Sequence, residues 1–456
     1  MGDGRGLDGG GARFFFIDLG ATAADLGRAI AAGRIDAVDL TDAYVSAIAD
    51  HPDADRIYAR TTPDRARGEA RAASHRAKSG QRRGPLDGVP VSWKDLFDTG
   101  GTATESGSLL LKGRVPAADA RVLANATAQG LICLGKTHMT ELAFSGLGIN
   151  PSTATPPNAI DPSLAPGGSS SGAAVSVALC LAAAAIGSDT GGSVRNPAAW
   201  NGLVGLKTTH GRLSLDGVVP LIPRFDTVGP LTRSVEDAAL LLAVLEGTRP
   251  ADLIGAGLAG ARFLVLTDAL ADVRDAPRTA FDAAVERLAA AGARISEGGF
   301  PGVGEALSFS GALYTAEAWA TWGIQIEARV DLMYAPVRER FEIGRSVSAA
   351  DYIRAWSRLT AIRADWAARM AGFDAVLCPT SAVLPPDVAQ LLSDPDYFTT
   401  ENLFAQRNTR IGNLMGGCVL TLPTPQPMCG ISLMAAPMGE ERLLRIGAAA
   451  ERALSA

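Results

Sequence analysis

The sequence predicts an α/β fold in which buried strands alternate with helices. Segments with apolar residues at helical spacing are followed by short apolar runs that are bounded by turn residues. Such short runs are typical of strands buried in a sheet. The chain also has 51 Gly and 26 Pro among its 456 residues, which is enough to separate many short elements by turns.

In the first part of the chain, apolar residues recur at helical spacing over 22–49, and Gly33 divides this segment into two short predicted helices. The next elements predicted are, in order, an exposed Ala- and Arg-rich helix over 60–80, strand character broken by turns over 86–97, a helix over 122–130 and a buried parallel strand over 131–134. Residues 150–172 are rich in Pro, Ser and Gly, and long loops of this kind are usually functional.

The second part begins with an apolar stretch from Ala173, which predicts a helix buried on all sides. The elements predicted after it are a strand over 261–266, a helix over 281–291, a strand over 293–295, a mainly helical region over 305–370 and a returning strand over 373–379.

Composition excludes several classes of protein. The net charge is −6, so we expect no nucleic-acid partner. The longest apolar stretch, Ala173–Gly187, is interrupted by Ser176 and is too short to span a bilayer, so we expect no membrane partner. The 5 cysteines form no Cys-x-x-Cys pair and the 4 histidines form no metal-binding motif, so we expect no metal and no cofactor. We predict a cytoplasmic protein, because residues 1–12 form a Gly-rich flexible leader rather than a signal peptide.

Three segments have the residue types of a catalytic site. They are Val91–Asp95, which places Lys94 in an apolar strand, the loop Pro166–Gly172, and the turn Gly187–Arg195. Each also has an ordinary interpretation: a solvated lysine, an anion-binding turn before a helix, and a tight glycine turn.

Phosphate binding and histidine-dependent hydrolysis are poorly supported by these segments. The sequence has no P-loop, and its one Gly-x-Gly-x-x-Gly string, Gly4–Gly9, has no strand before it. The Gly-x-Ser-x-Gly string Gly168–Gly172 follows a Pro-rich loop, whereas a nucleophile elbow follows a strand. Only His210 lies downstream, too close to leave room for the usual acid.

A serine nucleophile without histidine needs another base, and a lysine serves if it is neutral. Burial lowers the pKa of a lysine because desolvation disfavours its charged form. Serine–lysine arrangements are a known variant of the catalytic triad. The turn Thr190–Ser193 contains two glycines, which let backbone N–H groups approach a developing oxyanion.

In these segments the chain resembles the amidase signature family of serine hydrolases. The matching strings are Asp87–Asp95, Gly135–Thr137, Gly167–Ser170, Ser188–Arg195, Gly202–Thr208 and Asp226–Ser234. The resemblance implies a central mixed β-sheet covered by helices on both faces. It also implies a single domain over 13–456, with the signature core at about 80–240 and a helical variable region at about 300–370.

The resemblance further implies a Ser–cis-Ser–Lys triad. Ser193 matches the nucleophile, Ser169 the bridging serine after a cis peptide bond, and Lys94 the general base. The oxyanion would be held by the backbone amides of Thr190, Gly191, Gly192 and Ser193.

Several neighbours of the triad are expected to support it rather than react. Asp189 and Arg195 flank the nucleophile turn and are expected to hold its backbone, and Ser170 is expected to form hydrogen bonds within its loop. His138 and His210 are interpreted as hydrogen-bonded structural residues. The loop departs from the common family pattern at two positions, with Ser171 in place of a glycine and Ala173 in place of a serine.

The substrate pocket is less clearly marked. Candidate lining residues are Met139, Leu142 and Phe144, and the aromatic residues Tyr314, Trp319, Trp322 and Tyr334 of the variable region. Arg224 decides between two substrate types: facing the pocket it would favour an acidic or strongly polar acyl group, and facing solvent it would favour an apolar amide, anilide or carbamate. We favour the apolar case.

The resemblance implies hydrolysis of a C–N bond in an amide, anilide or carbamate (urethane), with a small-molecule substrate and a monomeric or homodimeric enzyme. Two alternatives stay open within the family: an amidotransferase-type subunit that delivers ammonia with partner chains, and a urea- or biuret-type amidohydrolase. A non-catalytic protein that keeps the fold is opposed by the intact Lys94, Ser169 and Ser193.

Overall fold

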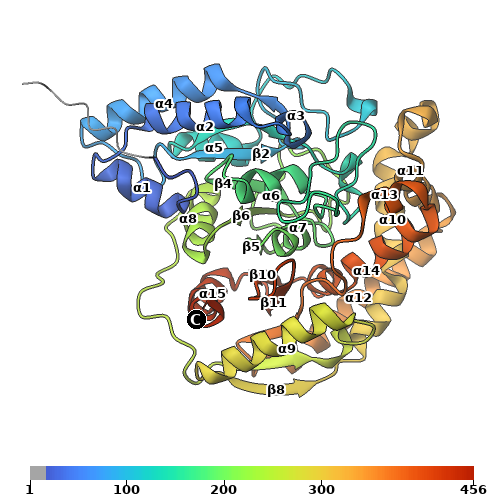
Figure 1. The fold of residues 1–456 in the computed structure, drawn as a ribbon. Helices are drawn as coiled ribbons and strands as arrows, with labels where there is room; N and C mark the ends of the chain where they lie inside the picture. Colours follow the sequence, from blue (N-terminus) through green and yellow to red (C-terminus); the bar gives the residue numbers. More distant parts are fainter. Residues whose placement is uncertain (1–16, 456) are drawn as a thin grey trace, which may run out of the picture.

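The structure, a computed structural model, describes residues 17–455, and its centre is one mixed β-sheet (Figure 1). Within those residues 11 strands form the sheet. In spatial order they are β1 (Tyr58–Thr61), β3 (Ile132–Thr137), β2 (Pro90–Lys94), β4 (Ala184–Ser188), β6 (Val228–Thr232), β5 (Val204–Lys207), β10 (Cys418–Pro423), β11 (Gly430–Ala435), β9 (Ala375–Pro379), β7 (Arg262–Leu266) and β8 (Arg294–Gly298). The predicted leader, residues 1–12, and the string Gly4–Gly9 lie outside the described residues.

Parallel and antiparallel pairs both occur in the sheet, which confirms the mixed sheet. Strand β2 runs parallel to β3 and to β4, and β7 runs parallel to β8 and to β9. The pairs in the middle of the sheet, from β4–β6 through β10–β11, are antiparallel. Because β2, β3 and β4 are parallel, their carboxyl ends meet at one edge, and this edge carries Lys94 and Ser188.

Helices cover both faces of the sheet, as predicted. They are α1 (Ala23–Ala31), α2 (Ala37–Asp50), α3 (Ala54–Ile57), α4 (Pro63–Lys78), α5 (Arg121–Ala128), α6 (Ser171–Ala178), α7 (Arg195–Trp200), α8 (Val235–Glu246), α9 (Asp275–Ala290), α10 (Gly302–Ala328), α11 (Ala335–Glu342), α12 (Ala349–Met370), α13 (Val388–Ser393), α14 (Pro395–Leu414) and α15 (Glu440–Ser455). Helices α6 and α7 pack on one face, and α8, α9 and α15 pack on the other.

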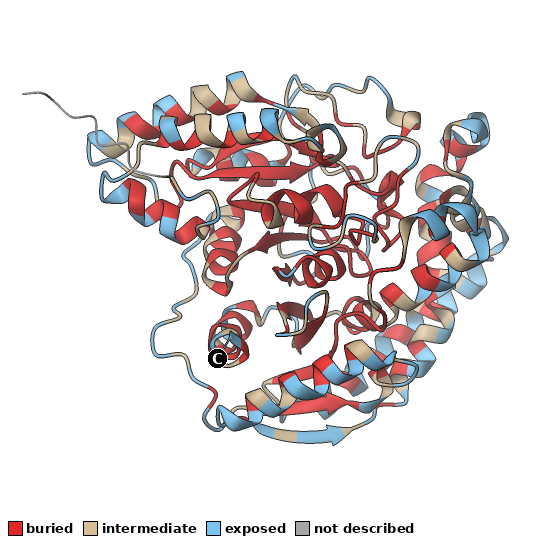
Figure 2. Ribbon diagram, viewed as in Figure 1, coloured by how far each residue is buried: buried red, intermediate tan, exposed pale blue. Residues whose placement is uncertain are grey.

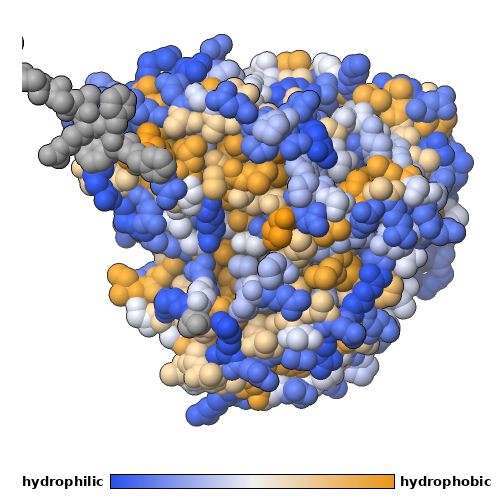
Figure 3. Space-filling model, in the orientation of Figure 1, coloured by the Kyte–Doolittle hydropathy of each residue, from blue (hydrophilic) through white to orange (hydrophobic). Residues whose placement is uncertain are grey.

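Burial follows this arrangement. The central strands and the helices next to them are almost entirely buried, whereas α10, α12 and α9 show exposed outer faces (Figure 2). Viewed from the same side, the surface carries hydrophilic residues over much of this face, with hydrophobic residues gathered between them (Figure 3). No helix between residues 17 and 455 is both long enough and apolar enough to cross a membrane.

Two predictions about single elements were wrong in detail. The apolar stretch Ala173–Gly187 is not one helix, because α6 ends at Ala178 and the chain then reverses into β4. Cys180, with a φ of 59°, lies in this reversal, and the Leu181 amide bonds back to the Ser176 carbonyl. The predicted exposed helix over 60–80 is α4, but it buries a stripe of small residues, Ala66, Ala70 and Ala73.

Candidate active site

Lys94 is the last residue of β2 and is completely buried. Its Nζ lies 2.8 Å from the Ser169 Oγ and 2.9 Å from the Ser188 Oγ. Burial lowers the pKa of Lys94 to about 7, and the nearby carboxylates of Asp189 and Asp226 oppose this shift only in part. Lys94 therefore has a large neutral fraction near pH 7 and can accept a proton there.

Ser169 reaches Lys94 from the loop that precedes α6. The peptide bond between Gly168 and Ser169 is cis, as the resemblance implied. The loop packs tightly here, since a Cβ on Gly168 would lie 2.6 Å from the Gly148 backbone nitrogen. The Gly167 and Gly168 amides bond to the carbonyls of Leu147 and Gly146, which fixes the approach of Ser169 to the strand edge.

Ser170 and the two departures from the family pattern lie in the same loop. The Ser170 Oγ exchanges hydrogen bonds with the backbone of Ser188, at 3.2 and 3.4 Å. Ser170 therefore ties the loop to β4 and does not form the bonds within the loop that we expected. Ser171 and Ala173 are buried in the first turn of α6, and the contact between Lys94 and Ser169 forms with both in place.

Ser193 lies in the turn between β4 and α7 and is 2% exposed. Its hydroxyl makes no hydrogen bond to another residue of the described chain. The backbone N–H groups of Thr190, Gly191 and Ser193 likewise have no acceptor among residues 17–455. Each of these three amides keeps its donor free, and their role in holding an oxyanion stays a prediction. The Gly192 amide differs, because it donates to Asp189 Oδ1 at 2.9 Å and is not free for this role.

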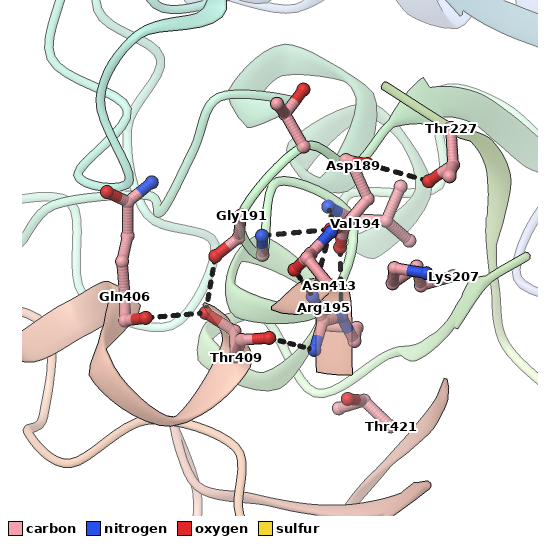
Figure 4. Close-up of polar contacts among 12 residues, drawn as sticks. Asp189, Gly191, Val194, Arg195, Lys207, Thr227, Gln406, Thr409, Asn413 and Thr421 are labelled. Atoms are coloured by element: carbon pink, nitrogen blue, oxygen red, sulfur yellow. Dashed lines mark hydrogen bonds and ion pairs between the residues drawn. The ribbon is translucent and has the colours of Figure 1, made fainter. Parts of the chain in front are cut away.

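Asp189 organises this turn through its carboxylate (Figure 4). Its carboxylate accepts from the amides of Gly192 and Val194 and from the guanidinium of Arg195, with both Arg195 contacts at 2.9 Å. Burial alone would raise the pKa of Asp189, but the ion pair with Arg195 outweighs it and holds the pKa well below its usual range. These contacts tie the backbone of the turn to the buried pair of Asp189 and Arg195.

Helix α14 also holds the turn (Figure 4). The Asn413 amide donates to Asp189 Oδ1 at 3.0 Å and accepts from Arg195 at 2.6 Å. The Thr409 hydroxyl donates to the Gly191 carbonyl at 2.7 Å, and the Thr409 carbonyl accepts from Arg195. These contacts fix the direction of the peptide groups next to Ser193.

Two further residues bind Thr190. Tyr314 on α10 donates its hydroxyl to the Thr190 carbonyl at 2.9 Å, and Asp226 accepts from the Thr190 hydroxyl at 2.6 Å. Sequence reasoning assigned no role to Asn413, Thr409, Asp226 or Ser188. The signal on α14 is a stripe of polar residues at helical spacing, Gln406, Thr409 and Asn413, in an otherwise mixed helix.

Only some of the residues predicted to line the substrate pocket line a cavity near the nucleophile turn. Phe144 and Tyr314 line one cavity of about 400 Å³ beside the nucleophile turn. Met139 and Leu142 are fully buried in the main hydrophobic core, and neither lines this cavity. Trp319 packs under the Arg345 guanidinium, 5.2 Å from its ring centroid, and does not line this cavity either.

The remaining sequence candidates lie away from this cavity. Arg224 is exposed and lies over the rings of Tyr352 and Trp356, at the edge of a different cavity of about 450 Å³. His138 and His210 bond to the carbonyls of Asp55 and Pro223, which confirms them as hydrogen-bonded residues.

Comparisons with known proteins agree with this geometry. The family model described as Amidase matches residues 39–444. The chain is 37% identical over 396 residues to 2-amino-5-chloromuconic acid deaminase of Comamonas testosteroni, covering 84% of this chain and 85% of that protein. It is 34% identical over 475 aligned residues to a glutamyl-tRNA(Gln) amidotransferase subunit of Anaeromyxobacter dehalogenans, covering 94% and 95%.

A solved structure described as an amidase superposes with a TM-score of 0.87 at 30% identity, covering 95% of this chain and 100% of that one. The match of the family model over most of the chain, the two relatives and this superposition together establish one conclusion. The chain belongs to the Amidase family and is a hydrolase that acts on C–N bonds.

Proposed function

We propose that this protein hydrolyses a small amide, anilide or carbamate through an acyl-enzyme formed on Ser193. One observation supports this proposal most directly. The Lys94 Nζ lies 2.8 Å from the Ser169 Oγ in a site where burial lowers the pKa of Lys94 to about 7. A neutral amine next to a serine hydroxyl is the base that a histidine-free hydrolase needs.

The proposed reaction begins when Ser169 passes its proton to neutral Lys94 and takes the proton of Ser193. The Ser193 oxygen forms a bond to the carbonyl carbon, and the carbonyl electron pair moves to oxygen. The tetrahedral intermediate collapses as Lys94 returns its proton through Ser169 to the leaving nitrogen, and the C–N bond breaks. Water then attacks the acyl-enzyme by the same relay and releases the acid.

The oxyanion of the intermediate is proposed to bind the free amides of Thr190, Gly191 and Ser193. Donors of this kind lower the barrier because they are already oriented when the charge develops. The hydrogen bonds from Tyr314 and Thr409 to the carbonyls of Thr190 and Gly191 support this assignment, since they hold the peptide groups in place.

The test is hydrolysis by the purified chain alone. An aliphatic amide, an aryl anilide, an aryl carbamate and glutamine are compared, each with wild type and with Ser193→Ala, and the release of amine or ammonia is measured. We expect turnover of at least one substrate that falls by about 10⁴-fold or more in Ser193→Ala. Turnover that persists in this variant would overturn the assignment of Ser193.

A second candidate is an amidotransferase-type subunit. It is favoured by the 34% identity, over nearly the full length, to a protein described as a glutamyl-tRNA(Gln) amidotransferase subunit. This role requires partner chains that receive the ammonia. The same panel separates the two functions, because release of ammonia to water by the lone chain supports the hydrolase, whereas activity only with a co-purified partner supports the amidotransferase.

A further inference from the structure

Two arginines line the cavity of about 400 Å³ beside the nucleophile turn. Its lining comes mainly from α10, α11, α14 and the segment after β3, and includes Phe144, Tyr314, Arg340 and Arg410. The two arginines come from α11 and α14, which are distant in sequence from the signature motifs. Neither arginine was a site candidate from the sequence.

The cavity wall directly contacts the turn that carries Ser193. The Tyr314 hydroxyl donates to the Thr190 carbonyl at 2.9 Å. A Cβ built on Gly191 would lie 3.6 Å from the Tyr314 ring and 3.9 Å from the Gln406 amide nitrogen. Gln406 in turn accepts from Arg340 Nη2 at 3.1 Å. Because Tyr314 both lines the cavity and bonds to this turn, a group bound at these arginines would lie about one side chain away from the turn.

Arg340 is held in place without an acid. Its guanidinium stacks on Phe144, with Cζ 4.4 Å from the ring centroid, and its Nη1 donates to the Phe144 carbonyl at 3.2 Å. Both of its hydrogen-bond acceptors are neutral oxygens. The stacking fixes the plane of the guanidinium, which preserves its ability to bind a carboxylate through two parallel hydrogen bonds.

Arg410 has even fewer partners. Its Cζ lies 5.8 Å from the centroid of the Tyr314 ring, and its Nη2 is buried with no hydrogen-bond partner. Neither Arg410 nor Arg340 forms an ion pair with any acid of the described chain. Glu339 is the acid that lines the cavity, but it is exposed and forms no ion pair with a described residue. In contrast, the buried Arg195 is paired with Asp189.

Two half-buried cations that share one cavity without a counter-ion are unfavourable. Burial lowers the pKa of Arg340 to about 9, with repulsion from Arg410 adding to the effect, and burial also lowers the pKa of Arg410. A bound anion would remove this cost by supplying the missing charge and the missing acceptors. A carboxylate fits best, because its two oxygens match the geometry of the guanidinium.

We propose that Arg340 and Arg410 bind a carboxylate of the substrate, so that the preferred substrate is a monoamide of a dicarboxylic acid. This inference rests on the proposed function, since it names the substrate class of the same site. It also replaces the apolar substrate favoured from the sequence, which depended on Arg224. In this proposal the positive charge that would bind an acidic acyl group comes from α11 and α14 and not from Arg224.

The experiment compares each acidic substrate with the uncharged methyl ester of the same acid. Succinamic and glutaramic acids are tested against their methyl esters, and kcat/KM for amide cleavage is measured. We expect wild type to prefer the acids by about 10-fold to 100-fold. Arg340→Gln and Arg410→Gln are expected to lose most of this preference, seen as the ratio of kcat/KM for acid and ester within each variant. Arg340→Lys is expected to recover part of it.

The matched control is Arg262→Gln. Arg262 is also stacked on an aromatic ring, with Cζ 5.6 Å from the centroid of Phe373, but it is exposed on β7 and does not line this cavity. This variant is expected to keep the wild-type preference. Equal cleavage of acids and esters by wild type would overturn the inference while leaving the proposed hydrolase intact.

A binding measurement separates the two proposals when no substrate is turned over. Succinate and glutarate are titrated calorimetrically into Ser193→Ala, alone and combined with Arg340→Gln and Arg410→Gln. Binding that is lost with the arginines supports the carboxylate site even if hydrolysis is not detected. Absence of binding to Ser193→Ala, or binding that is unchanged without the arginines, would overturn the inference.

Discussion

Lys94 differs from the other fully buried lysines of the chain in the partners of its amine. Lys136 contacts the carboxylate of Asp95 at 3.1 Å, and Lys207 donates to two backbone carbonyls. Lys94 contacts only the hydroxyls of Ser169 and Ser188. Hydroxyls can accept or donate, so Lys94 can be neutral without losing its hydrogen bonds.

This environment predicts the pH dependence of the reaction. Burial lowers the pKa of Lys94 to about 7, so the amine is protonated and inactive as a base below that pH. We expect kcat/KM to rise with pH and to level off once Lys94 is neutral, with the midpoint near 7. The profile is measured from about pH 5 to pH 9, with circular dichroism at each pH as the control for folding. A profile without a rising limb in this range would contradict Lys94 as the base.

The glycines before Ser193 provide a matched pair of substitutions. Gly192 has a φ of 132°, and a Cβ there would lie 2.1 Å from the Thr409 Oγ1. We expect Gly192→Ala to lower the free energy of unfolding by about 3 kcal/mol, because strain and overlap add. Gly191 lacks a positive φ and has its nearest Cβ neighbour at 3.6 Å.

Gly191→Ala is therefore expected to change the free energy of unfolding by less than about 1 kcal/mol. Denaturant titrations of both variants measure the difference. Equal stabilities would show that the tight packing between this turn and α14 does not constrain the turn.

The limits of sequence reasoning at this scale follow from distance along the chain. Lys94, Ser169 and the nucleophile turn lie in local motifs, so the resemblance selected them. Arg340, Arg410 and Asn413 lie on helices without such motifs. Only the folded chain brings Asn413 to the turn and the two arginines to one cavity. The sequence also could not predict that the Gly192 amide donates to Asp189, since this bond depends on the direction of the Asp189 carboxylate.

Among the elements, α14 contributes most to the site beyond the signature core. Asn413 joins both members of the buried pair of Asp189 and Arg195. We expect Asn413→Ala to lower the free energy of unfolding by about 2 kcal/mol, because it leaves groups of both residues without partners. We also expect kcat to fall, since Asp189 positions the turn of Ser193. Thermal unfolding and steady-state kinetics measure the two effects.

The control for this variant is Thr400→Ala. Thr400 lies on the same helix but is exposed, so its loss is expected to change neither stability nor kcat appreciably. An Asn413→Ala variant that is indistinguishable from this control would refute the positioning role of α14.

Helices and strands were predicted best where the spacing of apolar residues and the positions of turn residues indicate the same element. The helices at the N-terminus and the strand 375–379 match their predictions closely. The stretch Ala173–Gly187 misled, because an apolar run of this length without a Gly or Pro inside it does not reveal a reversal from helix to strand. Strands β10 and β11 were not predicted, although they complete the middle of the sheet.

At the scale of the whole molecule, the sheet joins distant parts of the chain. Strands β10 and β11, from the C-terminal part, lie between β5 and β9, and β10 pairs with β5 of the signature core. The helix α15 packs on β10 and on α8, which links the same two parts across one face. This continuity supports the expectation of a single domain.

A single domain with a shared sheet is expected to unfold cooperatively. Differential scanning calorimetry of the full chain without ligand is therefore predicted to show one transition, with the calorimetric and van't Hoff enthalpies in agreement. Two well-separated transitions would contradict the single domain and would assign the region around β7, β8 and β9 to a unit of its own.

The account depends above all on Ser193 as the nucleophile. The most direct test is mass spectrometry of the protein after reaction with a fluorophosphonate, with peptide mapping of the adduct. We predict one adduct, located on Ser193, that is absent from Ser193→Ala and slowed in Lys94→Ala. An adduct on any other residue, or one that persists in Ser193→Ala, would contradict the account.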